Sequence, residues 1–158
     1  LFLVYGPGQN DKRFLPQVVK SCLSDSSFPT SAGEQVRDFC YVDDITDGIL
    51  STFTNDGVNG EVINLASGVP IAIREVVEKI QNTVNLGIPE FGKVEYRICE
   101  NMSLYADTSK AKLLLGWDPS VMIEDGIEVV PWVKANNPDL ILLDLMLPNA
   151  NGPSKRII

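Results

Sequence analysis

The sequence predicts an α/β fold, and the order of its apolar segments is the main reason. Short apolar runs typical of strands alternate along the chain with longer segments in which apolar residues recur every three or four positions. The chain has 158 residues, of which 44% are hydrophobic, so it is long enough to bury a core. We therefore expect one α/β domain, or one domain with a remnant of another.

The first two elements are a buried strand and a helix. LFLVY at 1–5 is a continuous apolar run, and a turn rich in glycine and proline at 6–8 ends it. RFLPQVVKSCLS at 13–24 predicts a helix, with Pro16 in the first turn, where proline is tolerated. Because the chain starts inside an apolar strand, we expect it to be a piece of a longer protein.

The middle of the chain predicts a strand, a helix and a second strand. Residues 36–42 are rich in aromatic and β-branched side chains, which favours a strand. Residues 44–53 predict a helix with isoleucine and phenylalanine at four-residue spacing, capped by Asp43 or Asp44. EVINLA at 61–66 then predicts another strand.

The remaining elements continue the alternation. Residues 73–84 are strongly periodic and predict a helix, whereas 85–103 are mixed and predict a loop. A short capped helix is expected at 107–117, followed by a helix at 122–136 that contains a proline, and by a buried strand at 139–147.

Composition excludes several function classes. The net charge of −8 gives no basic surface for nucleic acid or an anionic membrane, and no apolar run reaches the length of a membrane span. The chain has no histidine, which excludes Ser-His-Asp and Cys-His catalysis and most zinc sites. Its three cysteines (Cys22, Cys40 and Cys99) are scattered, so we expect reduced thiols, no metal and a cytoplasmic protein.

Five short motifs come in one order and at one spacing. They are VYGPGQ at 4–9, RFLP at 13–16, GEQVRDFCYVDDI at 33–45, VINLASG at 62–68 and YADTSKAKLLLGW at 105–117. Together they resemble the C-terminal half of the NAD-dependent epimerase/dehydratase family, the extended short-chain dehydrogenases/reductases that act on nucleotide sugars. The resemblance covers residues 1–134. It implies the C-terminal part of a Rossmann-like fold with its small substrate-binding subdomain, NAD or NADP as cofactor, isomerase or lyase chemistry, and a homodimeric parent enzyme.

The same resemblance assigns three residues to the nucleoside diphosphate of the sugar. Arg37, in GEQVRDF, would bind the diphosphate, and a guanidinium does fork across two phosphate oxygens. Arg97 and Glu100 match an Arg-x-x-Asp/Glu pattern in which the arginine binds phosphate and the carboxylate accepts from ribose hydroxyls. The alternatives are an Arg37 that only pairs with Asp38, and an Arg97–Glu100 ion pair on the surface.

Three further residues are candidates for substrate binding. Asn64, in VINLASG, matches a family asparagine near the nucleotide, although it could instead tie a strand end to the next loop. Arg13 and Phe14 fall where the family lines the substrate groove, and for Phe14 a core position is the better interpretation. Asp43 and Asp44 are assigned to helix capping.

The family's catalytic Tyr-x-x-x-Lys and its Gly-x-x-Gly-x-x-Gly do not occur in the sequence. No catalytic residue can therefore be named in this chain. We expect it to be the substrate-binding half of an enzyme, inactive alone and unable to hold NAD by itself.

The C-terminal segment has a resemblance of its own. NPDLILLDLMLPNANG at 137–152 is similar to the phosphoacceptor strand of response-regulator receiver domains, with Asp144 in the acceptor position. We expect residues 135–158 to be a tail that is either a receiver fragment or a chance strand. Two other function classes stay open: a non-catalytic module that binds nucleotide sugars, and a signalling protein that acts through this tail.

Overall fold

A three-stranded sheet lies at the centre of the molecule. The computed structural model describes residues 1–6 and 8–127. Its central strand, β3 (Val36–Tyr41), pairs in parallel with β1 (Leu3–Tyr5) and antiparallel with β4 (Pro70–Ala72). The predicted α/β class and the predicted strands at the start of the chain and at 36–42 are confirmed.

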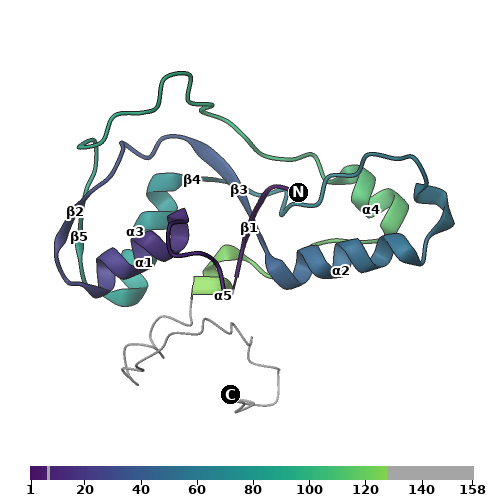
Figure 1. Ribbon diagram of the computed structural model, residues 1–158, viewed down its shortest axis with the longest axis horizontal. Coiled ribbons are helices and arrows are strands. Elements are labelled where there is room, and N and C mark those ends of the chain that lie inside the picture. The colour runs from purple at the N-terminus through teal and green to yellow at the C-terminus, as the bar shows by residue number, and fades with distance from the viewer. Residues whose placement is uncertain (7, 128–158) are drawn as a thin grey trace, which may run out of the picture.

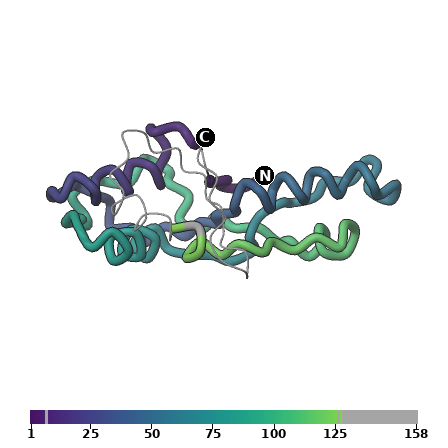
Figure 2. The backbone as a smooth tube through the Cα atoms, turned by 90° about the horizontal axis from the view of Figure 1, so that it is seen from below, coloured from purple at the N-terminus to yellow at the C-terminus, as the bar shows by residue number. Residues whose placement is uncertain are grey.

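Helices flank this sheet in two groups. Figure 1 shows β3 running between α1 and α3 on one side and α2 and α4 on the other, and Figure 2 shows α2 and α4 extending together away from the rest. The helices are α1 (Phe14–Leu23), α2 (Val42–Phe53), α3 (Ile73–Val84), α4 (Ser109–Leu115) and α5 (Ile123–Ile127), with a short 3-10 helix at Asp56–Val58. None of those in the described part of the chain is long and apolar enough to cross a membrane.

Strand β3 is buried on both faces, and each face contacts a different apolar core. Successive side chains of a strand point to opposite faces. Phe39 and Tyr41 therefore pack with α1 and α3, whereas Cys40 packs in a second cluster with α2 and α4. The first core also holds the apolar face of α3 (Val76, Val77, Ile80 and Val84), and the second includes Ile45, Leu65, Ala111 and Trp117.

Three short strands were not predicted from the sequence. They are β4, and the two strands of a separate parallel sheet, β2 (Ser27–Pro29) and β5 (Ile88–Glu90). Each has three residues and contains a proline, so neither an apolar period nor β-propensity marks it. The loop expected at 85–103 therefore contains a strand.

The strand predicted at 61–66 is wrong. These residues have no regular secondary structure, although Leu65 and Ala66 are buried and the Phe2 N–H donates to the Leu65 carbonyl oxygen at 3.3 Å. A loop that enters the core needs the same apolar residues as a strand, so the pattern alone could not separate the two.

The predicted capping of α2 is also wrong. The helix begins at Val42 with Tyr41 as its N-cap, and no side chain caps it. Asp43 is exposed in the first turn, where its charge suits the positive end of the helix dipole, whereas Asp44 is buried. The expected apolar face is incomplete as well, since Phe53 is 79% exposed.

The helices predicted at 13–24, 73–84 and 107–117 are confirmed. The last of them ends at Gly116, which adopts the left-handed conformation with φ of 63°. The expected helix at 122–136 is present as α5 over its described part. The strand expected at 139–147 and Asp144 lie outside the described residues.

Candidate functional site

Arg37 lies in the first half of β3 and forms an ion pair with Glu100. The side chains of the two residues are only 12% and 21% exposed. The Arg37 guanidinium also donates from Nη1 to the Val36 carbonyl oxygen at 2.8 Å, so its position is fixed by two acceptors. The alternative in which Arg37 pairs with Asp38 is therefore wrong, because the carboxylate beside the guanidinium belongs to Glu100.

Glu100 reaches Arg37 because the segment between β5 and α4 runs alongside β3. In Figure 1 this segment, residues 91–108, arches across the top of the view. The Val36 N–H donates to the Met102 carbonyl at 2.8 Å, and the Leu104 N–H donates to the Val36 carbonyl at 3.0 Å. Two backbone hydrogen bonds to one residue of β3 thus hold this segment against the strand.

Arg97 lies in the same turn as Glu100. The Glu100 N–H donates to the Arg97 carbonyl at 3.0 Å, and the Arg97 side chain is exposed. Just before this turn, the Tyr96 hydroxyl accepts from the Glu34 N–H at 3.0 Å, which ties the turn to the loop that leads into β3. The structure therefore brings Arg37 and Glu100 into contact and places Arg97 three residues before Glu100 in the same turn.

The other predicted residues lie in different surroundings. Asn64 is exposed, and its Nδ2 donates to the Asp107 carbonyl at 3.1 Å, so it does tie its loop to the start of α4. Arg13 is exposed at the N-terminus of α1. Phe14 is half-buried and stacks on Phe39 with ring centroids 6.1 Å apart, which is the core position expected for it.

Sequence reasoning missed Asp38, the residue after Arg37. Its side chain is fully buried and accepts four hydrogen bonds. The donors are the Ser67 N–H and hydroxyl, the Gly68 N–H and the Ala106 N–H. The available signal was an aspartate inside an apolar strand, because such a carboxylate stays buried only when several donors surround it.

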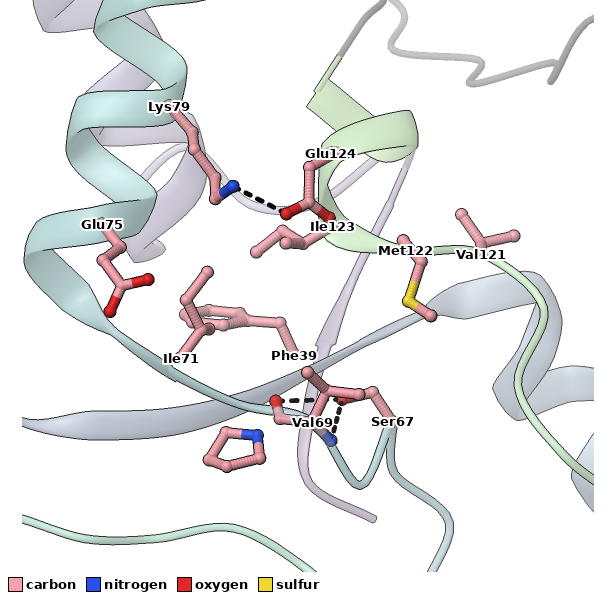
Figure 3. A pocket seen from close by; sticks show the side chains of 11 residues that line it. Phe39, Ser67, Val69, Ile71, Glu75, Lys79, Val121, Met122, Ile123 and Glu124 are labelled. Carbon is pink, nitrogen blue, oxygen red and sulfur yellow. Dashed lines mark hydrogen bonds and ion pairs between the residues drawn. The ribbon is translucent and has the colours of Figure 1, made fainter.

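A cavity of about 180 Å³ opens on the Phe39 face of β3 (Figure 3). Beside it, Lys79 Nζ lies 2.7 Å from Glu124 Oε1, and this contact holds the pKa of Glu124 below its ordinary value. The lining of the cavity comes from β3, from β4 and the loop before it, from α3, and from α5 and the segment before it: Phe39, Ser67, Val69, Pro70, Ile71, Glu75, Lys79, Val121, Met122, Ile123 and Glu124. None of the residues predicted to bind substrate lines this cavity.

Three buried titratable groups near the sheet are not suited to proton transfer at neutral pH. Burial raises the pKa of the Tyr5 hydroxyl above its ordinary value, and the hydroxyl donates to the Met122 carbonyl at 3.3 Å. Burial likewise raises the pKa of Cys22 to about 11 and that of Cys40 to about 12. These three groups therefore stay protonated at neutral pH.

The turn after β1 packs against the N-terminus of α2. A Cβ on Gly6 would lie 2.4 Å from Val42 Cγ1, so this position has no room for a side chain.

Three comparisons with known proteins point to similar proteins. Residues 1–66 match the model of the "NAD dependent epimerase/dehydratase family". The chain is 32% identical over 132 residues to CDP-abequose synthase of Salmonella typhimurium, covering 79% of this chain and 44% of that protein. It is also 32% identical over 142 residues to UDP-glucuronate 4-epimerase of Thermodesulfobacterium geofontis, covering 85% of this chain and 42% of that one. The chain thus spans less than half the length of these curated relatives.

The fold agrees with the sequence matches. The UDP-glucuronic acid 4-epimerase of Bacillus cereus, solved in complex with UDP-glucuronic acid and NAD, superposes with a TM-score of 0.72 at 28% identity. The match covers 85% of this chain and 44% of that structure. The family model over residues 1–66, the relatives and the solved structure agree in one respect: the chain is similar to the NAD-dependent epimerase/dehydratase family, the extended short-chain dehydrogenases/reductases.

Proposed function

We propose that residues 1–134 are the substrate-binding half of an NAD-dependent epimerase or dehydratase acting on nucleotide sugars. The observation that carries the proposal is the Arg37–Glu100 pair. It places a mostly buried guanidinium beside a carboxylate, with a second arginine, Arg97, in the same turn as that carboxylate. In a chain with a net charge of −8, an anionic ligand must be held by individually placed arginines.

Each group of this cluster suits one part of a nucleoside diphosphate. Arg37 presents a planar fork that matches two phosphate oxygens, and Arg97 adds a second positive charge from the surface. When Arg37 turns to the diphosphate, the Glu100 carboxylate is free to accept from the two ribose hydroxyls. The epimerase of Bacillus cereus bound to UDP-glucuronic acid supports a UDP-sugar as the ligand.

The chemical conversion is proposed to need residues that this chain does not contain. Its 158 residues include neither a Tyr-x-x-x-Lys nor a Gly-x-x-Gly-x-x-Gly. We expect the purified chain, mixed with NAD and UDP-glucuronic acid, to give no product by chromatography, and turnover would contradict this part of the proposal. The whole enzyme is proposed to be a cytoplasmic homodimer.

Arg37→Ala tests the binding role directly. We expect this change to weaken UDP binding by about 1.5–3 kcal/mol, the contribution of a charge-assisted hydrogen bond, while binding of uridine barely changes. Arg37→Lys should recover only part of the affinity, because an ammonium group cannot fork across two oxygens. Isothermal titration calorimetry with UDP, CDP and uridine gives these values.

Lys20→Ala is the matched control, because it also removes one positive charge but from an exposed pair with Asp11. It should leave UDP binding unchanged. If Arg37→Ala weakens uridine and UDP equally, Arg37 only supports the strand, and the proposed diphosphate contact is wrong.

A further inference from the structure

The fully buried carboxylate of Asp38 joins β3 to two other segments. Its Oδ1 accepts from the Ser67 N–H at 2.8 Å and from the Ser67 hydroxyl at 2.6 Å. Its Oδ2 accepts from the Gly68 N–H at 3.0 Å and from the Ala106 N–H at 3.2 Å. One side chain thus connects the central strand to the loop before β4 and to the segment before α4.

These two segments carry the remaining polar residues of the proposed site. Asn64 lies three positions before Ser67, and Glu100 lies six positions before Ala106. We propose that Asp38 is a positioning residue that sets the spacing between β3, which carries Arg37, and the segments that carry Asn64 and Glu100. This inference rests on the proposed nucleotide-sugar function and adds to it a residue that does not contact the ligand.

The geometry of the strand gives Arg37 and Asp38 separate tasks. Adjacent side chains of a strand point to opposite faces, so Arg37 contacts Glu100 on one face while Asp38 accepts from Ser67, Gly68 and Ala106 on the other. Both carboxylate oxygens of Asp38 are used. An asparagine at position 38 would keep the shape of the side chain but would offer only one acceptor oxygen and an NH₂ group. At least one of the backbone N–H groups that now donate to Asp38 would then face this NH₂ group, which is itself a donor.

The chain contains a matched control for this arrangement. Asp44 is also buried, and it accepts from the Ser120 N–H at 3.0 Å, the Ser120 hydroxyl at 2.8 Å and the Val121 N–H at 3.0 Å. It ties α2 to the segment before α5, which carries no residue of the proposed site. Equivalent changes at Asp38 and Asp44 therefore separate positioning from simple stabilisation.

The experiment compares Asp38→Asn with Asp44→Asn in the full chain, with UDP as the probe. Both changes should lower the melting temperature, because each leaves buried donors unsatisfied. Only Asp38→Asn should weaken UDP binding, by about tenfold, while Asp44→Asn stays within about twofold of the unchanged chain. If either variant does not fold, Ser67→Ala replaces Asp38→Asn and Ser120→Ala replaces Asp44→Asn. Ser67→Ala removes only the hydroxyl that donates to Asp38, and Ser120→Ala only the hydroxyl that donates to Asp44.

A second readout does not depend on any ligand. Hydrogen exchange followed by NMR should show faster exchange of the Leu104 and Ala106 amides in Asp38→Asn. If Ser67→Ala is used instead, the Gly68 amide should exchange faster. The variants at Asp44 or Ser120 should leave the exchange of all three amides unchanged. Unchanged exchange at these amides in the Asp38 and Ser67 variants would overturn the inference.

The outcomes separate the inference from the proposed function. If Arg37→Ala weakens UDP binding but Asp38→Asn does so no more than Asp44→Asn, the proposed function stands and the positioning role is refuted. If Arg37→Ala has no effect on UDP binding, the proposed function fails, and the inference fails with it.

Discussion

In the proposed site, Glu100 and a bound diphosphate would compete for the Arg37 guanidinium, and Glu100→Gln tests this competition. Without ligand, Arg37 already donates to the Glu100 carboxylate. Glutamine keeps the length of the side chain but removes its charge. We therefore expect Glu100→Gln to strengthen the binding of inorganic pyrophosphate, because the competing anion is gone, and to weaken the binding of uridine, because the ribose hydroxyls lose a charged acceptor.

The burial of the pair sets the size of the effect. Exposed ion pairs contribute only about 0.2–1 kcal/mol, whereas hydrogen bonds to charged groups contribute about 1.5–3 kcal/mol. The two side chains are 12% and 21% exposed, and glutamine can still accept a neutral hydrogen bond, so we expect about 1–2 kcal/mol. At 25 °C this corresponds to pyrophosphate binding that is about 5- to 30-fold tighter. For UDP the two effects oppose each other, and its affinity should change little.

Calorimetry with pyrophosphate, uridine and UDP at one fixed salt concentration measures the three affinities, since salt screens such charges. Glu124→Gln is the control, because it also replaces a carboxylate that is paired with a cation, here Lys79 at 2.7 Å. Glu124→Gln should not change the affinities for pyrophosphate and uridine in opposite directions. If Glu100→Gln weakens pyrophosphate binding, or shifts pyrophosphate and uridine in the same direction, the competition between Glu100 and phosphate for Arg37 is refuted.

Two further predictions concern stability. Gly48 lies inside α2, where a Cβ would sit 2.9 Å from Leu65 Cδ2 and 3.0 Å from Trp117 Cε2. Gly48→Ala should therefore lower the free energy of unfolding in urea by about 1 kcal/mol, because overpacking outweighs the helix propensity gained, and a rise would contradict the packing. The raised pKa values of Cys22 and Cys40, about 11 and 12 against an ordinary 9.0, predict stability that is fully present below pH 9 and falls as the pH rises towards 11, because unfolded thiols ionise first. Urea midpoints across this range should fall less steeply in Cys40→Ala, and equal slopes would contradict the prediction.

The sequence by itself determined the elements whose signals are local. Helix α3 was predicted at its observed bounds, Ile73–Val84, because its apolar residues repeat with the helical period and its buried face follows from that repeat. Strand β3 was predicted from its aromatic and β-branched residues, and the α/β class from the alternation of strand-like and helix-like segments. The family resemblance was equally available from the sequence, because its motifs are short, ordered and independent of long-range contacts.

Tertiary structure decided what depends on partners far along the chain. Strands β2 and β5 are too short to show a period, and each exists because the other pairs with it across about 60 positions. The buried loop around Leu65 imitates a strand, since burial and not hydrogen bonding sets its composition.

The partners of Arg37 and Asp38 also lie far along the chain. Adjacent in sequence, they suggested an ion pair with each other, but the alternation of a strand directs them to opposite faces. Arg37 instead pairs with Glu100, 63 positions later, and Asp38 binds backbone groups of Ser67, Gly68 and Ala106. The sequence named the charged residues of the candidate site, and only the packing of the segment at 91–108 against β3 decided which of them meet.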